Sequence, residues 1–208
     1  MNINYHKLCL EEISKQTNTK SIMLHSCCAP CSSYVITFLS NYFDITILYY
    51  NPNISPKEEY EKRKKEQIKL IQNLKTKNKL NFLDCDYDND IYEKNIKGFE
   101  NTPEGGSRCH ICFNLRLDKT GKLAKENNYD YFCSTLTVSP HKNSKIINEI
   151  GEKISQKYQI KWLYSDFKKN EGFKQSIELS KKYELYRQDY CGCTYSKKAK
   201  EKQEIILK

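Results

Sequence analysis

The chain has 208 residues, of which 38% are apolar and 12% are aromatic. This length suits one domain, and 16 Tyr and 8 Phe with many Ile and Leu supply a core, which excludes a wholly disordered chain. No apolar run reaches the roughly 18 residues of a membrane span. Residues 1–20 contain no hydrophobic signal core. We therefore expect a soluble, cytoplasmic protein.

The net charge is +9, because 35 Lys and Arg residues outnumber 26 Asp and Glu residues. A basic surface favours polyanionic partners such as nucleic acid. A general preference for lysine would give the same excess, since Lys, Asn and Ile are all used heavily. Charge alone leaves both interpretations open.

Short apolar runs alternate with longer amphipathic segments along the chain. Apolar and β-branched runs predict strands over residues 21–26, 44–50, 80–85, 129–135 and 160–164. Apolar residues at helical spacing predict helices over residues 31–42, 57–77, 109–127, 144–158 and 173–183, with a polar first helix within about 1–20 and a basic, helix-prone tail over about 194–208. Two prolines make 51–56 a loop, and 86–107 is expected to be irregular.

This alternation predicts an α/β fold with one parallel sheet flanked by helices in a single domain, residues 1–208. In such folds ligands bind beyond the carboxyl ends of the strands. Residues with unusual chemistry follow four of the predicted strands there: Cys27, Asn51, Thr135 and Asp166. His25 lies beside Cys27, and we expect it to support the site from the core rather than to bind a ligand.

Ten cysteines are the most informative feature of the composition. In a reducing compartment disulfide frameworks are rare, so clustered thiols indicate metal binding or redox chemistry. Seven of the ten fall in three groups: Cys27, Cys28 and Cys31; Cys109 and Cys112; and Cys191 and Cys193. Cys9, Cys85 and Cys133 are isolated in helix or strand patterns, and we expect them to be structural.

The first group joins a predicted strand to a helix, where the helix dipole favours a thiolate. The second group places two sulfurs on one helical face, a common half-site for zinc or an iron–sulfur cluster. In the third group, Gly192 frees the backbone to curl around a metal or substrate, although a redox dithiol or a surface turn would use the same residues. Seven thiols exceed one tetrahedral zinc site, which slightly favours iron–sulfur without excluding zinc.

Several polar residues near these groups are further candidates. Thr135 to Asn143 carry hydroxyls, His141 and Lys142 that could hold a polar substrate, or simply cap a helix. Near the start of 57–77, Glu59 and Arg63 are expected to form an exposed ionic pair. The residues expected to contact phosphates of a nucleic acid are Arg108, Arg116, Lys142 and Arg187. No Walker-type loop and no GxGxxG pattern occurs.

These motifs, in this order, resemble the QueH-type epoxyqueuosine reductases. The matching stretches run from about Leu24 to Ser196 and include LHSCCAPCSSY, YYNPNISPKEEYEKR, GFENTPEGGSRCHICFNLRL, YDYFCSTLTVSPHKNS and YELYRQDYCGCTYS. The resemblance implies a Rossmann-like fold related to nucleotide α-hydrolases. It also implies the cobalamin-independent last step of queuosine synthesis, in which epoxyqueuosine at the wobble position of tRNA is reduced to queuosine. The implied cofactors are a 4Fe–4S cluster and a neighbouring mononuclear metal, taken to be iron.

Carried over by motif, the expected cluster ligands are Cys27, Cys28, Cys109 and Cys112, with Cys31 or a nearby carboxylate on the second metal. Cys191 and Cys193 are expected to serve that second site or redox chemistry. The candidate proton donors are Asp189, Tyr190 and His141, and an external electron donor is required. Two alternatives stay open: an RNA-binding module stapled by zinc, and a metal-free thiol oxidoreductase.

Overall fold

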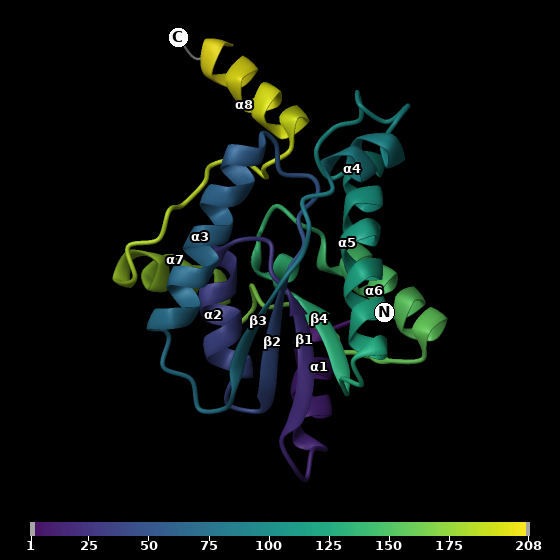
Figure 1. Cartoon of the computed structure of the whole chain (residues 1–208), viewed down its shortest axis with the longest axis vertical. Helices are drawn as coiled ribbons and strands as arrows, with labels where there is room; N and C mark the ends of the chain where they lie inside the picture. Colours follow the sequence, from purple (N-terminus) through teal and green to yellow (C-terminus); the bar gives the residue numbers. More distant parts are fainter. Residues whose placement is uncertain (1–2, 207–208) are drawn as a thin grey trace.

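Five parallel strands form the centre of the structure, a computed structural model that describes residues 3–206 (Figure 1). The strands lie in the order β3-β2-β1-β4-β5. Their bounds are Lys20–His25 for β1, Phe43–Tyr49 for β2, Leu80–Asp84 for β3, Tyr131–Ser134 for β4 and Lys161–Trp162 for β5. This Rossmann-like α/β architecture in one domain confirms the predicted fold class.

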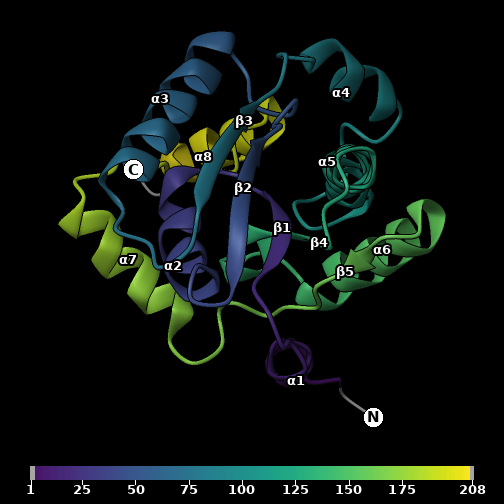
Figure 2. The same cartoon turned by 60° about the horizontal axis from the view of Figure 1, so that its bottom comes forward.

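Helices cover both faces of the sheet. They are α1 Tyr5–Ser14, α2 Ala29–Leu39, α3 Lys57–Asn73, α4 Asn89–Asn95, α5 Ser107–Glu126, α6 Ser144–Tyr158, α7 Gly172–Lys182 and α8 Thr194–Ile206, with a 3₁₀ turn, η1, over Thr135–Val138. Figure 2 shows α2, α3 and α7 on one side of the sheet and α5 and α6 on the other. Within residues 3–206, no helix is long and apolar enough to cross a membrane.

The order in which strands are added to the sheet reverses at β1. From β1 it moves outward through β2 to β3, and α5 then returns it to β4 on the other side of β1. Parallel crossovers are right-handed, so helices before and after this reversal cover opposite faces. The loops that leave β1 and β4 therefore separate at their carboxyl ends, which is where doubly wound sheets bind ligands.

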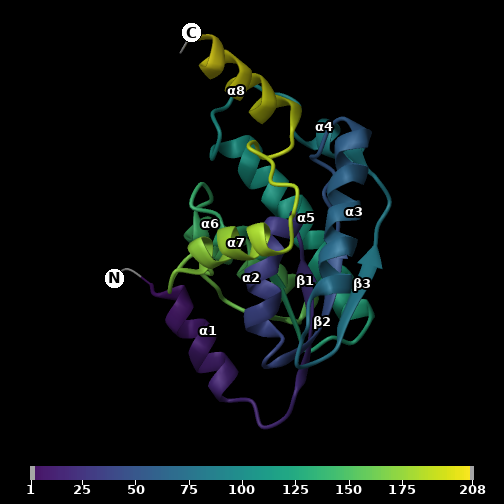
Figure 3. The ribbon, with the colours of Figure 1, turned by 90° about the vertical axis from the view of Figure 1, so that its left-hand side faces the viewer.

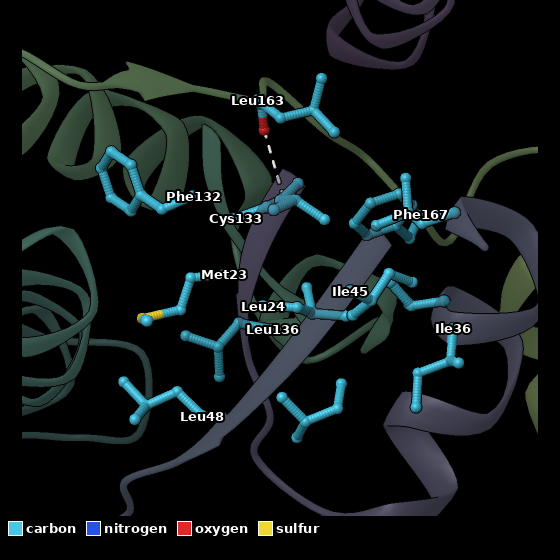
Figure 4. Packing of buried hydrophobic residues seen from close by; sticks show 14 of the residues in the cluster. Met23, Leu24, Ile36, Ile45, Leu48, Phe132, Cys133, Leu136, Leu163 and Phe167 are labelled. Atoms are coloured by element: carbon cyan, nitrogen blue, oxygen red, sulfur yellow. Dashed lines mark hydrogen bonds between the residues drawn. The ribbon is translucent and has the colours of Figure 1, made fainter. Parts of the chain in front are cut away.

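The core is built from strands that are buried on both faces. Ile22, Met23 and Leu24 of β1 are fully buried, and the pairing of β1 with β2 and β4 aligns them with mostly apolar neighbours. Figure 4 shows Met23 and Leu24 packed among side chains from β4, η1 and α2. Central parallel strands buried on both faces have continuous apolar sequences, so these strands could be predicted from the sequence.

The largest departure from the predicted elements is at the sheet edge. β5 covers two residues instead of 160–164. Beyond Trp162, the amide of Asn148 accepts from the backbone N–H of Ser165 at 3.0 Å and donates to its carbonyl at 2.8 Å. A side chain thus replaces the neighbouring strand and ends the ladder.

Helices α4 and α3 also differ from prediction. The expected irregular segment contains α4, whose Tyr92 packs with Ile96, Cys112 and Cys193, so a distant contact stabilises it. α3 ends at Asn73, before the predicted residue 77, because the chain then turns to pair Asn78 with Ser40. The expected terminal helices over about 1–20 and 194–208 correspond to α1 and α8, and their residues 1–2 and 207–208 lie outside the described residues.

Candidate metal centre and substrate cavity

A cavity of about 960 Å³ opens beyond the carboxyl ends of the strands. Its walls come from the loop after β1 (Cys27, Pro30, Cys31), the segment after η1 (Ser139, His141, Lys142), α5 (Arg116), α7 (Phe173, Ser176) and residues between 187 and 203. We call residues 187–206 the C-terminal arm. It contains α8, which projects above the body of the molecule in Figures 1 and 3.

The thiol loop, residues 27–31, is the densest group of ligand atoms. The sulfurs of Cys27, Cys28 and Cys31 lie within 4.8 Å of one another, and those of Cys27 and Cys28 are 3.9 Å apart. No other three Cys, His, Asp or Glu side chains within residues 3–206 gather this closely. Cys28 is the N-cap of α2, so the positive end of the helix faces these sulfurs. The geometry suits a soft metal or cluster.

The three thiols have unequal acidities. Hydrogen bonds from Cys28 and Cys31 hold the pKa of Cys27 well below its usual range, and Lys142 and Thr135 act in the same direction. The bond with Cys27 is the main cause that raises the pKa of Cys28 to about 11, and the bonds with Cys27 and Cys28 raise that of Cys31. Cys27 is therefore the most acidic thiol of the loop.

Residues after β4 hold the thiol loop from across the chain reversal. The Thr135 hydroxyl accepts from the Cys27 N–H at 3.2 Å and donates to the Cys27 sulfur at 3.4 Å. Beneath them, His25 donates from Nε2 to the Tyr50 carbonyl and accepts at Nδ1 from the Ser134 hydroxyl. Burial lowers the pKa of His25 to about 3, so the imidazole is neutral. His25 supports the loop from within the core, as expected.

A buried polar network supports the other side of the loop. Ser26 and Ser32 both donate to the Gln67 side-chain oxygen, at 2.6 and 3.0 Å, and Ser32 also bonds the Cys28 carbonyl. Gln67 lies on α3 and has no exposed surface. Sequence reasoning missed it, because a glutamine within a charged helix has no local signal of burial.

Four further thiols gather where α5 meets the C-terminal arm. Cys112 and Cys193 are buried and pack together with Tyr92, while Cys191 lines the cavity. The pKa of Cys112 is raised to about 12, chiefly by burial; the charge of Arg116 opposes the rise, and Cys191, Cys193 and Cys109 add to it. These three thiols therefore lie close enough to Cys112 to affect its ionisation. Two of these thiols also accept backbone hydrogen bonds near the start of a helix. Near the start of α8, Cys193 accepts from the Ser196 N–H, and near the start of α5, Cys109 accepts from the Gly105 N–H.

Arg116 links the two thiol groups. Its guanidinium is 1% exposed, donates to Asn51 and to the Cys112 carbonyl, and leaves Nη2 buried without a partner. Among residues 3–206 no carboxylate pairs with it. The charges of Cys112, Cys191 and Cys27 instead raise its pKa against the effect of burial. A buried cation with thiols nearby and no carboxylate partner favours the thiolate form of those thiols.

The predicted residues are distributed unequally around the cavity. The residues that line it are Cys27, Cys31, Cys191, Arg116, Lys142, Arg187, His141, Asp189 and Tyr190. Cys28, Cys109, Cys112 and Cys193 lie behind that surface. Arg108 is also set back: its guanidinium is buried and donates to the Glu100 and Thr102 carbonyls, both at 2.6 Å. Asp189 is paired with Lys200.

One expectation from the sequence is wrong. Glu59 and Arg63 do form an ionic pair, at 2.7 Å, but the Arg63 side chain is only 2% exposed. The spacing of the two residues is what an exposed helical pair would show, so the local pattern gave no sign of burial. Glu104 and Phe173 also line the cavity without having been singled out.

The fold and the site define a doubly wound α/β protein with a cysteine-rich cavity at the reversal point of its sheet. The family model "Epoxyqueuosine reductase QueH" matches residues 22–199, and the chain belongs to this family. Its relatives include proteins named epoxyqueuosine reductase QueH from three bacteria. That of Streptococcus pyogenes serotype M1 is 44% identical over 94% of this chain and 79% of the relative. That of Staphylococcus epidermidis is 44% identical over 93% and 84%, and that of Thermotoga maritima 33% identical over 85% and 90%.

Proposed function

We propose that the protein reduces epoxyqueuosine to queuosine at the wobble position of tRNA, without cobalamin. The epoxide oxygen leaves as water, and the ring gains a carbon–carbon double bond. This step consumes two electrons from an external donor and two protons. Membership of the QueH family supports the reaction class. One observation locates the proposed reaction: a single cavity is lined by Cys27, Cys31 and Cys191 together with Arg116 and Lys142.

The donor set fits an iron–sulfur centre. Three sulfurs lie within 4.8 Å of one another, three more thiols lie around Cys112, and Arg116 offsets negative charge between the two groups. When bound, a 4Fe–4S cluster with a neighbouring iron supplies single electrons and Lewis acidity toward the epoxide oxygen. We propose Cys27, Cys28, Cys109 and Cys112 as cluster ligands, with Cys31, Cys191 and Cys193 available to the second metal.

The remaining residues of the cavity bind and orient the nucleotide. RNA-modifying and RNA-binding proteins read bases that are turned out of single-stranded loops and stacked on aromatic or guanidinium planes. Phe173, Tyr190 and Arg187 offer such planes on the wall, and Arg187 and Lys142 offer charge to the phosphates. Burial raises the pKa of the Tyr190 phenol, so it keeps a proton that it can donate at neutral pH. His141 and Asp189 are the other proposed proton donors.

The test is nucleoside analysis of epoxyqueuosine-tRNA after anaerobic incubation with the protein and a chemical reductant, alongside iron, sulfide and zinc analysis. We expect iron, sulfide and a loss of epoxyqueuosine matched by a gain of queuosine. A colourless zinc protein that binds tRNA and leaves the epoxide intact would instead establish a zinc-stapled binding module. Turnover that persists after removal of all metal would establish a thiol oxidoreductase using Cys191 and Cys193.

A further inference from the structure

The cysteine turn, residues 191–193, lies outside the sheet and outside every helix. It belongs to an irregular segment that connects α7 to α8. Even so, three of its backbone groups form hydrogen bonds to other parts of the chain. The Cys191 carbonyl accepts from Arg63 at 3.2 Å, the Gly192 carbonyl accepts from the Ser55 N–H at 3.0 Å, and the Cys191 N–H donates to the Ser196 hydroxyl at 3.1 Å. The position of the Cys191 sulfur therefore depends on residues far away in the sequence.

Arg63 is the one charged side chain among these contacts. Its Nε donates to Glu59 on the same helix, and Glu59 in turn accepts from the Tyr186 hydroxyl at 3.3 Å. The Tyr190 ring lies over the guanidinium at 5.1 Å. Arg63 thus contacts Tyr190 and Cys191 directly and is linked to Tyr186 only through Glu59, and its 2% exposure leaves little freedom to move.

Gly192 has the shape that this contact requires. Its φ is +118°, a conformation that L side chains rarely adopt. A Cβ at this position would lie 2.9 Å from Nη1 of Arg63 and 3.0 Å from Cγ1 of Ile54. The glycine therefore permits both the turn and the close approach of the guanidinium. Arg63 and Gly192, 129 positions apart in the numbering of the chain, are fitted to each other.

We propose that Arg63 is a positioning residue that fixes the Cys191-Gly192-Cys193 turn against α3 and so keeps the Cys191 sulfur on the wall of the cavity. It acts through the backbone of the turn and touches neither the nucleotide nor a metal ligand's sulfur. The inference deepens the proposed function, because it states what holds one of the thiols in that site. Its geometric content is independent of the reaction.

The test measures the reactivity of individual thiols in the full-length, metal-free, reduced protein. Under anaerobic conditions with a chelator, N-ethylmaleimide labels the chain for varied times, and mass spectrometry gives the labelling rate of Cys191 relative to that of Cys31. The variants are Arg63→Gln, Arg63→Lys and Gly192→Ala. The matched control is Lys65→Gln, an exposed residue on the same helix.

We expect the relative rate of Cys191 to change at least about fivefold in Arg63→Gln and in Gly192→Ala, since both lose the contact between the guanidinium and the turn. Arg63→Lys should show a smaller change in the relative rate than Arg63→Gln but should still differ from the wild type. Its ammonium keeps the charge and lacks the planar group that bonds Glu59 and the turn at the same time. Lys65→Gln should match the wild type. Gly192→Ala retains Arg63, so it serves if Arg63→Gln does not fold.

Two results would overturn the proposal. One is an unchanged Cys191 rate in a variant whose thermal unfolding matches that of the wild type. The other is an equal change at Cys31 and Cys191, because that would show general loosening rather than loss of one contact. Neither tRNA nor metal enters the measurement, so failure of the reductase assignment leaves its outcome intact, and the reverse also holds.

Discussion

The two ends of the sheet carry similar cations but pair them differently. At the amino end, a hollow of about 340 Å³ is lined by Lys20, Lys125 and Lys161. Lys20 pairs with Asp130 at 3.6 Å, and Lys161 pairs with Glu12 at 3.5 Å. Charges that are exposed and paired in this way contribute little to stability and attract little from solution.

At the carboxyl end, two cations that line the cavity, Arg116 and Lys142, have no carboxylate partner within residues 3–206. Arg116 is buried, and the charges of Cys27, Cys191 and Cys31 raise the pKa of Lys142 against the effect of burial. A buried cation without an anion costs several kcal/mol, so such groups persist where a ligand supplies the missing charge. The comparison therefore favours the carboxyl end over the amino end as the place where a ligand binds.

The strongest test of this comparison is Cys27→Ala. Cys27 is the most acidic thiol of the loop and a proposed cluster ligand, so its loss should abolish bound iron. The reduction of epoxyqueuosine-tRNA should fall by more than about 100-fold, which exceeds the roughly 10- to 100-fold cost of changing a residue that only orients a metal ligand. The control is Cys9→Ala, a fully buried thiol in α1. It should cost about 1 kcal/mol of stability and leave iron content unchanged. Full iron content in Cys27→Ala would remove Cys27 from the ligand set.

A second test removes the unpaired cation. In Arg116→Met, the metal-free protein should unfold at the same or a higher urea concentration, by up to about 2 kcal/mol, because an uncompensated buried charge is replaced by an apolar chain. Affinity for iron should fall about tenfold, since the thiolates lose their compensating charge. Urea unfolding and competition with a chelator measure the two quantities. A metal-free variant destabilised by more than about 2 kcal/mol would show that Arg116 is structural, and the comparison would fail.

The features that sequence reasoning found are those encoded locally. Helix α6 was predicted with its correct bounds, because Asn143 caps its first amides and Ile147 and Ile154 mark its buried stripe. The meeting of Cys27 with Thr135 followed from parallel strands, whose carboxyl ends share one edge. Periodicity and strand direction therefore sufficed for the sheet and for one wall of the cavity.

The features that were missed depend on contacts between distant segments. The burial of Arg63 is decided by the Cys191 carbonyl, and α4 is stabilised by packing of Tyr92 on Cys193. β5 was predicted too long because the strand pattern cannot reveal that Asn148 bonds Ser165. The composition of a helix or strand says which faces are apolar, but it does not say which partner will cover them.

A third test compares one basic residue from each end. Arg187 is exposed on the cavity wall, whereas Lys125 lies in the hollow at the amino end. Arg187→Ala should weaken tRNA binding about 3- to 10-fold at low salt and reduce the slope of log affinity against log salt by about 1. Lys125→Ala should leave both unchanged. Equal losses in the two variants, measured by filter binding over a range of salt, would mean that RNA is attracted by overall charge and not by this end of the sheet.

The smallest expected effect is at Asp130, which accepts from the backbone N–H and hydroxyl of Ser21 at 2.8 and 2.9 Å. Burial acts to raise the pKa of this carboxyl, but the Ser21 bonds and the charge of Lys20 outweigh it and lower the pKa overall. Because the folded pKa is below the unfolded value of about 3.9, the carboxylate stabilises the protein above that pH and loses its contribution as pH falls through the folded pKa.

Asp130→Asn should therefore cost about 1 kcal/mol at pH 7 in urea unfolding. The difference from the wild type should vanish as the pH is lowered below the folded pKa. Iron content and reduction should stay at wild-type levels, and a loss of either would show that the amino end also serves the site.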